Sequence, residues 1–204
     1  MQSLVATKFL QRQILTHNKN KNKSSQIFEN IVIKKPNSCD VFINHRGTDT
    51  KRSFASLLYD HLFHLKIRPF LDNKTMKPGD KLFEKIDTAI KGCKIGVAIF
   101  SPRYCESYFC LHELALMTEL RKKVIPVFCD VKPAELRVLD NGKMSKEEFE
   151  RFSLALEEAK YTMGLVFNSQ QGNWSDIVRD AADIVVESLE EIEENEEEEE
   201  IMLL

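Results

Sequence analysis

Short apolar runs alternate along this chain with longer stretches in which apolar residues recur every three or four positions. An uninterrupted apolar run between turn residues is typical of a buried strand, and the longer spacing is typical of an amphipathic helix. In the first helical stretch, for example, Phe54, Leu58 and Leu62 fall on one face. The pattern predicts strands at 39–43, 67–71, 94–100, 123–128 and 163–167, and helices at 52–65, 81–91, 108–120, 145–160 and 173–192.

This alternation predicts an α/β fold in which helices cover both faces of one parallel sheet. Right-handed crossovers leave few arrangements of five such strands. We expect a flavodoxin-like three-layer sandwich with a five-stranded parallel sheet in the order 2-1-3-4-5. Pro69 lacks an amide proton, which favours an edge position for the second strand.

The same strand order predicts where a ligand would bind. The chain reverses direction between the first and third strands, and ligands bind beyond the carboxyl ends of such strands. The loop after the first strand is 44–50, and the loop after the third, 101–107, leads into the helix that carries Glu113. The topology therefore brings Arg46, Gly47 and the start of that helix around one crevice.

Residues that commonly cap helices precede several of the helical stretches. Asp49 or Thr50 is expected to cap the first helix, and Asp80 the second. Ser145 and Glu148 have the spacing of a capping box at the start of the fourth helix.

Both ends of the chain differ in composition from its middle. We divide it into a basic arm at 1–36, a domain at 37–190 and an acidic tail at 191–204. The arm is expected to be disordered, with an organelle transit peptide as the alternative, because the first 28 residues contain no Asp or Glu. The tail is nearly all Glu, and mutual repulsion predicts that it frays or stays disordered.

Charge and cysteine usage narrow the choice of partners. The net charge of -3 indicates no preference for nucleic acid or for a membrane surface. No apolar run approaches the roughly 18–20 residues that span a bilayer. The five cysteines are odd in number and lack a C-x-x-C pair, which indicates reduced thiols and no metal site. Reduced thiols favour the cytoplasm, and the nucleus or an organelle are the alternatives.

Several enzyme classes have signatures that this sequence lacks. There is no G-x-G-x-x-G for a dinucleotide cofactor, no P-loop and no G-x-S-x-G nucleophile motif. The crevice instead has a cationic loop at Arg46 and Gly47, a second one with Lys74, Lys77 and Gly79, and the carboxylate of Glu113. Arg and Lys bind phosphate, and a single Glu can stabilise a positively charged, sugar-like transition state. These residue types suggest cleavage of a glycosidic bond in a phosphorylated nucleoside.

Four segments resemble, in order and at the right spacing, the successive motifs of plant Toll/interleukin receptor (TIR) domains. They are CDVFINHRGTDTKRSF, IRPFLDNKTMKPGD, AIKGCKIGVAIFSPRYCESYFCLHEL and VIPVFCDVKPAELR. The resemblance implies the flavodoxin-like fold and a stand-alone TIR protein, without nucleotide-binding or leucine-rich-repeat segments. It also implies hydrolysis of the nicotinamide–ribose bond of NAD+, which is then a substrate, so that no cofactor is expected.

The resemblance also assigns roles to individual residues. It makes Glu113 the catalytic residue, which holds the ribose hydroxyls and stabilises the oxocarbenium as nicotinamide leaves. The segment DNKTMKPGD is expected to close over the substrate and to pack on a neighbouring subunit, because family members act as self-associated assemblies. The nucleotide-binding residues that we expect are Asn44, Arg46, Gly47, Lys77, Gly79, Ser101 and Phe109.

Three residues depart from the family pattern. Phe109 stands where the W-C-L-x-E-L stretch has its Trp, and it offers a smaller stacking face. His45 stands where the family has Phe before Arg-Gly, which changes the polarity of the pocket. Leu57 replaces the His of a Ser-His pair that many members use for self-association, which puts the usual dimer contact in doubt.

Each selected residue also has a purely structural interpretation. Glu113 in isolation is a solvated helix carboxylate, and Arg46 could pair with Asp49 or Asp72. Cys110 is expected to be buried, as small thiols often are. His112 is expected to point to water.

Two function hypotheses therefore remain open at this stage. The first is an NAD+ glycohydrolase that signals in plant innate immunity, with other TIR-containing receptors as further partners. The second is a non-catalytic TIR adaptor that binds receptor TIR domains. Cleavage or cyclisation of nucleotides from nucleic acid is a weaker third, because the chain has no basic patch outside its first residues.

Overall fold

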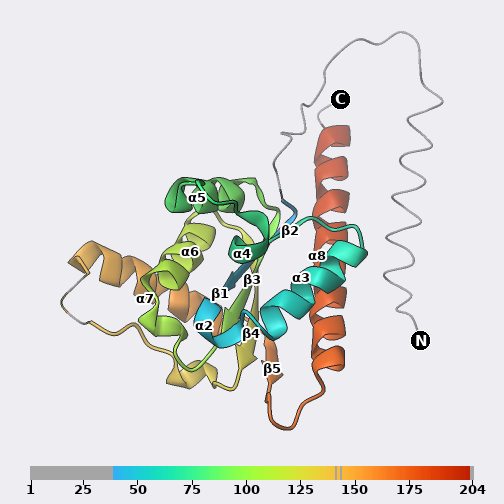
Figure 1. Ribbon diagram of the computed structural model, residues 1–204. Helices are drawn as coiled ribbons and strands as arrows, with labels where there is room; N and C mark the ends of the chain where they lie inside the picture. Colours follow the sequence, from blue (N-terminus) through green and yellow to red (C-terminus); the bar gives the residue numbers. More distant parts are fainter. Residues whose placement is uncertain (1–38, 141, 143, 203–204) are drawn as a thin grey trace.

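A computed structural model describes residues 39–140, 142 and 144–202, and Figure 1 shows them as one sheet between two layers of helices. The strands are β1 (Val41–His45), β2 (Pro69–Phe70), β3 (Ile95–Phe100), β4 (Lys123–Cys129) and β5 (Leu165–Phe167). The helices are α2 (Gly47–Thr50), α3 (Phe54–His64), α4 (Asp72–Thr75), α5 (Leu82–Gly92), α6 (Tyr108–Glu119), α7 (Lys146–Tyr161) and α8 (Trp174–Met202), with single turns at η1 (Tyr104–Glu106) and η2 (Pro133–Glu135).

The five strands form one parallel sheet in the order β2-β1-β3-β4-β5, which confirms the predicted topology. The central strand β3 pairs with β1 in the register Val41↔Ile95 and with β4 in the register Ile95↔Lys123. Pro69 lies in β2 at one edge of the sheet, as its missing amide proton predicted.

Alternate strand residues supply two separate cores. One core joins the sheet to α3 and α8, with Leu58 and Val185 fully buried among its helix residues. The other joins the opposite face to α5, α6 and α7, with Ile90, Leu111 and Phe152 at most 1% exposed. Because successive side chains of a strand point to opposite faces, uninterrupted apolar strands are required when helices cover both.

The helix starts agree only in part with the predicted caps. Ser145 and Glu148 form the expected capping box at the start of α7. The prediction for Asp49 and Thr50 was wrong, because both lie inside the short helix α2, and α3 begins after Ser53. The prediction for Asp80 was also wrong, because its carboxylate accepts a 2.9 Å bond from the Lys77 amide.

The acidic end of the chain continues α8 to Met202, so the prediction that it frays or stays disordered was wrong. Three cation–carboxylate pairs and one apolar contact hold this part of the helix against the domain. Lys123 pairs with Glu191 at 2.6 Å, and Lys94 lies 3.3 Å from Glu193. Lys94 also lies 3.4 Å from Glu196, and Ile192 packs against the α3–α8 core. These contacts offset part of the repulsion between neighbouring Glu side chains.

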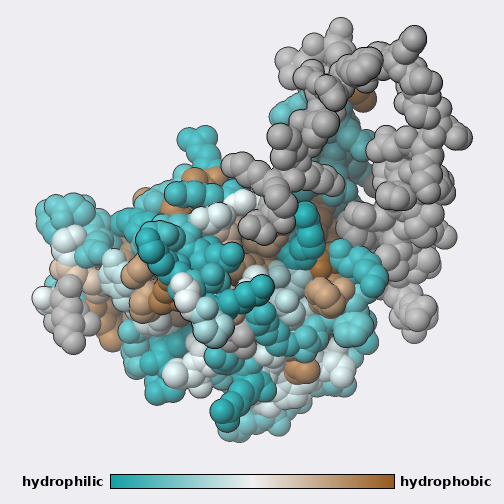
Figure 2. All heavy atoms as spheres, turned by 45° about the horizontal axis from the view of Figure 1, so that its top comes forward, coloured by the Kyte–Doolittle hydropathy of each residue, from teal (hydrophilic) through white to brown (hydrophobic). Residues whose placement is uncertain are grey.

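The surface carries few large apolar areas in the view of Figure 2, where hydrophilic residues predominate and hydrophobic ones form small patches. In the part of the chain that the structure describes, no helix has both the length and the apolar composition that crossing a bilayer requires. The predicted basic arm at 1–36 lies outside the described residues, and the domain bounds at 37 and 190 stay predictions.

Candidate active site

Glu113 lies in the middle of α6, and its residue is only 9% exposed. The helix begins at Ser107, whose side chain accepts a 3.3 Å bond from the Cys110 amide. It lies close against the sheet because Gly96 of β3 has no side chain: a Cβ there would come 2.3 Å from the Met117 sulfur. The solvated-carboxylate interpretation of Glu113 therefore does not describe this position.

The Glu113 carboxylate is held by the end of β1. Asn44 Nδ2 donates 2.7 Å to Glu113 Oε2 and also lies 3.2 Å from the Cys110 carbonyl. The Tyr104 hydroxyl donates to Asn44 Oδ1 and contacts the same carbonyl at 3.1 Å. Asn44 and Tyr104 are both completely buried, so this network fixes the carboxylate from inside the protein.

Burial raises the pKa of Glu113 to about 8. The hydrogen bond from Asn44 opposes this shift, because it favours the charged carboxylate, while the charges of Asp72 and Asp87 add to it. A buried carboxyl whose pKa lies near neutral pH is a common property of catalytic groups.

Arg46 follows β1 directly and lies at the mouth of the same region. Its guanidinium donates 2.9 Å to Asp49 Oδ1 and 3.1 Å to Glu106 Oε2. The interpretation of Arg46 as a partner of Asp49 is thereby confirmed. Among the described residues no hydrogen bond or ion pair joins Arg46 to Glu113, so the two side chains are held by separate partners.

Asp49 accepts hydrogen bonds from residues of the loops that follow β1 and β3. Ser101 Oγ donates to it at 2.8 Å, and Arg103 donates at 2.7 Å. Burial works against ionisation, but these two hydrogen bonds lower the pKa of Asp49, so its carboxylate stays charged. Ser101 is 2% exposed. It therefore joins the two loops, and a direct contact with a nucleotide would require it to turn away from Asp49.

The predicted binding residues thus divide into two groups. Asn44 is buried like Ser101 and is used inside the chain, so its place is that of a positioning residue for Glu113. Gly47 opens α2, and a Cβ there would meet nothing within 4 Å. Lys77 and Gly79 lie in the exposed loop between α4 and α5, where Gly79 has a φ of +98° that favours glycine.

Phe109 lies one helical turn before Glu113 on the same face of α6 and is 40% exposed. Its ring is tilted against Phe83 of α5, with centroids 5.1 Å apart. Phe83 is 45% exposed, and it also meets the edge of His112. Two half-exposed aromatic rings, Phe83 and Phe109, therefore pack on each other at the start of α6, one helical turn before Glu113. Nothing in the local sequence around Phe83 signalled this pairing.

The prediction that His112 points to water was wrong. Its Nε2 lies 3.3 Å from Asp87 Oδ1, and its Nδ1 lies 3.2 Å from the Arg151 guanidinium. Arg151 in turn pairs with Glu119. The imidazole thus ties α5, α6 and α7 together behind the aromatic pair.

His45, the departure before Arg-Gly, is 8% exposed. Its Nδ1 lies 3.1 Å from Thr50 Oγ1. Its Nε2 lies 3.6 Å from Asp72 Oδ1 and has no hydrogen-bond partner in the described chain. The imidazole therefore stands between β1 and the start of α4, next to one of the carboxylates that raise the pKa of Glu113.

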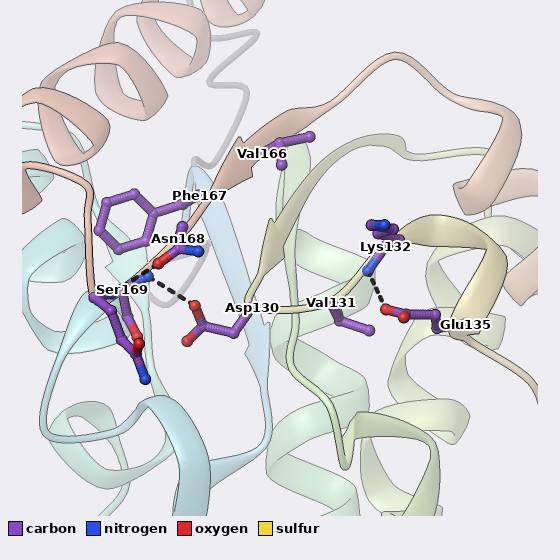
Figure 3. A pocket seen from close by; sticks show the side chains of 9 residues that line it. Asp130, Val131, Lys132, Glu135, Val166, Phe167, Asn168 and Ser169 are labelled. Atoms are coloured by element: carbon purple, nitrogen blue, oxygen red, sulfur yellow. Dashed lines mark hydrogen bonds between the residues drawn. The ribbon is translucent and has the colours of Figure 1, made fainter.

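The cavities that the described residues line lie away from Glu113. A groove of about 540 Å³ at the carboxyl ends of β4 and β5 is lined by Asp130, Lys132 and Val166 among others (Figure 3). There the Ser169 amide donates 2.7 Å to Asp130 Oδ1. In the described ranges no cluster of three or more His, Cys, Asp or Glu could hold a metal ion.

Comparison with known proteins identifies the family. The TIR domain family model matches residues 39–200. A Brachypodium distachyon protein named probable 2' cyclic ADP-D-ribose synthase BdTIR is 49% identical over 158 residues, which are 76% of this chain and 70% of that protein. TMV resistance protein N of Nicotiana glutinosa is 30% identical over 168 residues, 74% of this chain and 15% of that protein.

A solved structure agrees with the sequence relatives. The TIR domains in a structure of the activated Roq1 resistosome directly recognizing the pathogen effector XopQ superpose with a TM-score of 0.63 at 28% identity. The match covers 70% of this chain and 96% of that one. The chain therefore belongs to the TIR domain family.

Proposed function

We propose that this protein cleaves the nicotinamide–ribose bond of NAD+ and signals through the product in plant innate immunity. The observation that carries the proposal is the buried Glu113 carboxylate, held by Asn44 at the switch point of a TIR fold. The name of the Brachypodium relative, a probable cyclic ADP-ribose synthase, supports a reaction at NAD+. NAD+ is the substrate in this proposal, and no resident cofactor takes part.

The proposed reaction breaks the bond between the ribose C1' and the nicotinamide nitrogen. The bonding electrons leave with nicotinamide, which becomes neutral, and positive charge develops on the ribose. An ionised Glu113 stabilises that charge and accepts hydrogen bonds from the ribose hydroxyls. Water then adds to C1' and loses a proton, which gives ADP-ribose.

A cyclic product needs only a different nucleophile. If a hydroxyl of the same nucleotide adds to C1' in place of water, the product is a cyclic ADP-ribose. Its mass is lower than that of ADP-ribose by one water. We propose cyclisation as the finer form of the activity, on the strength of the relative's name. In this arrangement Arg46 and Lys77 face phosphates, Gly47 leaves room for them, and Phe109 stacks on a base.

We further propose that the active form is a self-associated assembly of TIR domains. The structural neighbour is a resistosome whose TIR domains lie in one assembly, and relatives include disease resistance proteins. The exposed loop at 76–81 beside α4 is the segment that a neighbouring copy would meet. We place the protein in the cytoplasm, with the nucleus or an organelle as alternatives.

The second candidate is a TIR adaptor without catalysis. The three departures favour it: Phe109 for Trp, His45 for Phe and Leu57 for His. Of these, His45 touches the residues around Glu113 through its backbone, because the Cys110 thiol donates to its carbonyl at 3.3 Å. Even so, the residues that hold Glu113 are in place, which favours the enzyme.

The test measures nicotinamide release from NAD+ by the purified full chain at high concentration with a molecular crowder. We expect release by the unchanged protein, loss of at least about a hundredfold in Glu113→Ala, and full activity in Glu158→Ala. Glu158 is an exposed glutamate of α7 with no ion pair within the described chain. Mass spectrometry of the nucleotide product separates hydrolysis from cyclisation. Equal release by all three proteins would rule out Glu113 as the catalytic residue, and no release by any of them while the chain captures other TIR domains would establish the adaptor instead.

A further inference from the structure

Two thiols lie near each other at the amino ends of β1 and β3, at the opposite end of these strands from the candidate active site. Cys39 lies two residues before β1, and Cys93 lies between α5 and β3. Neither takes part in the network around Glu113. Both belong to the core on the α5–α7 side, Cys93 as a buried residue and Cys39 as a partly buried one packed against it.

The register of the sheet sets these two residues side by side. Val41 pairs with Ile95 at the start of the β1–β3 ladder. The amides of Lys94 and Ile95 both donate to the Asp40 carbonyl, at 2.9 and 3.2 Å. Continued back along both strands, this register places Cys39 opposite Cys93. Neighbouring strands lie about 4.8 Å apart, and a disulfide needs Cα atoms about 4.4–6.8 Å apart.

The two side chains also point toward the same turn of α5. Cys39 Sγ donates to the Ala89 carbonyl at 3.4 Å, and Cys93 Sγ donates to the Ile90 carbonyl at 3.1 Å. These acceptors are consecutive residues in the last turn of α5. Both thiols therefore point toward the C-terminal end of α5. Backbone register and side-chain direction therefore both suit a bond between the sulfurs.

We propose that Cys39 and Cys93 form a disulfide when the protein meets hydrogen peroxide. The Cys93 thiolate attacks one peroxide oxygen, so that an S–O bond forms and the O–O bond breaks. The hydroxide that leaves takes up the proton that Cys93 lost on ionising and becomes water. The Cys39 thiol then attacks the resulting sulfenic sulfur, and an S–S bond replaces the S–O bond. The released hydroxide takes the Cys39 proton and becomes the second water. Two thiols are oxidised and one peroxide is reduced.

The surroundings single out Cys93 as the thiol that ionises. The neighbouring Cys93 thiol and burial raise the pKa of Cys39, so Cys39 keeps its proton and reacts second. The hydrogen bond from Cys39 and the charge of Lys122 lower the pKa of Cys93. Lys122 Nζ lies 2.7 Å from the Cys93 carbonyl, which fixes the cation beside the thiol. Burial raises the pKa of Cys105 and Cys129 to about 11 each and that of Cys110 to about 12, so these stay protonated and unreactive.

Access to the pair is through Cys39. Cys93 is 2% exposed, whereas Cys39 is partly exposed at the point where the described chain begins. Hydrogen peroxide is close in size to water, so it reaches a thiol that larger reagents do not. The bond would close a loop from residue 39 to residue 93. This inference does not depend on the proposed NAD+ activity.

The experiment treats the reduced full chain with a small excess of hydrogen peroxide and maps the wild-type protein by non-reducing peptide mass spectrometry. We expect a peptide pair linked through Cys39 and Cys93, and a fall in free thiols from the five of the sequence to three. We also expect the melting temperature to rise by about 5 °C or more and to return when dithiothreitol is added. Mapping the unchanged chain avoids any loss of fold in a variant.

Variants then test the assignment. Cys39→Ser and Cys93→Ser should each abolish the rise in melting temperature, whereas Cys105→Ser and Cys129→Ser should retain it. Five free thiols after peroxide, a link between any other two cysteines, or oxidation of Cys93 to a sulfinic acid while Cys39 stays free would overturn the proposal.

Discussion

The amide of Asn44, one residue before the end of β1, donates a 2.7 Å hydrogen bond to Glu113 on α6, 69 positions further along the chain. A completely buried side chain of the central sheet thus sets the direction of the carboxylate. Because Tyr104 holds Asn44 in turn, no reorganisation of solvent is needed to aim the carboxylate.

The first prediction concerns Asn44→Ala. This change removes the donor that favours the charged form of Glu113, so the pKa of Glu113 should rise further. A hydrogen bond to a charged group contributes about 1.5–3 kcal/mol, which corresponds to a loss of about ten- to a hundredfold in NAD+ cleavage at pH 7. The measurement is kcat/KM against pH, where the acidic limb should move to higher pH. Tyr104→Phe leaves the Asn44–Glu113 hydrogen bond in place and should shift the acidic limb of kcat/KM less. An unchanged profile in Asn44→Ala would refute the positioning role.

The second prediction concerns the pH dependence of folding stability. Between the ordinary pKa of 4.5 and the folded-state pKa of about 8, the folded protein binds the Glu113 proton more tightly than the unfolded chain does. The unfolding free energy should therefore fall as pH rises through this window. Glu113→Gln keeps a hydrogen-bond acceptor for Asn44 and removes the charge. It should be more stable than the unchanged protein by up to a few kcal/mol at pH 8 and nearly equal to it at pH 4.5. Urea unfolding across pH 4.5–8.5 measures this, with Glu158→Gln as the control that should show no pH-dependent difference.

The third prediction separates free enzyme from the substrate complex. The nicotinamide ring of NAD+ carries a positive charge, which on binding near Glu113 favours the ionised carboxylate. The acidic limb of kcat, which reports the complex, should therefore lie at lower pH than the limb of kcat/KM, which reports the free enzyme. Coincident limbs would mean that the bound ring does not approach this carboxylate.

The fourth prediction concerns the close packing of α6 on the sheet at Gly96. An alanine Cβ at Gly96 would lie 2.3 Å from the Met117 sulfur, so Met117 must move. Gly96→Ala should cost about 1–3 kcal/mol of stability in urea unfolding. Combined with Met117→Ala, which makes room, it should cost clearly less than the sum of the two single changes. Simple additivity would show that the close approach is not a constraint.

The fifth prediction concerns self-association. Leu57 is 46% exposed and lines a groove of about 450 Å³ with Trp174 and Val178 of α8. If this apolar surface replaces the Ser-His contact, Leu57→Asp should lower the average mass in sedimentation at high concentration and reduce NAD+ cleavage with it. Leu154→Asp, at a 69% exposed position of α7, is the matched control and should change neither. Equal loss in both variants would point to general effects of added charge.

The fold followed from the sequence because its strongest signals are long and local. The runs that became β1, β3 and β4 are apolar on both faces, and crossover handedness then fixed their order. The caps predicted at Asp49 and Asp80 were wrong because each prediction depended on a single polar residue and not on a long pattern. A short polar side chain can cap a helix or close a turn, and the bond from the Lys77 amide decided in favour of the turn at Asp80.

The sequence predicted where the candidate site lies in the fold, but it did not predict which side chains are hydrogen-bonded to each other there. Topology predicted that Glu113 and Arg46 lie near the carboxyl end of β1, where the structure places both, and the motif singled out the carboxylate. Sequence spacing could not show that Asn44 would turn inward to Glu113, because the two lie on different elements. The same holds for His112, whose partners Asp87 and Arg151 come from α5 and α7.

The continuation of α8 to Met202 has a consequence for how copies of this chain can meet. Eight of the ten residues at 191–200 are Glu, which gives one flank of the molecule a dense line of like charge. At 0.1 M ionic strength the screening length is about 10 Å, so two such flanks brought face to face would still repel each other. Assemblies must therefore keep these flanks apart, and raising the salt concentration should ease their formation.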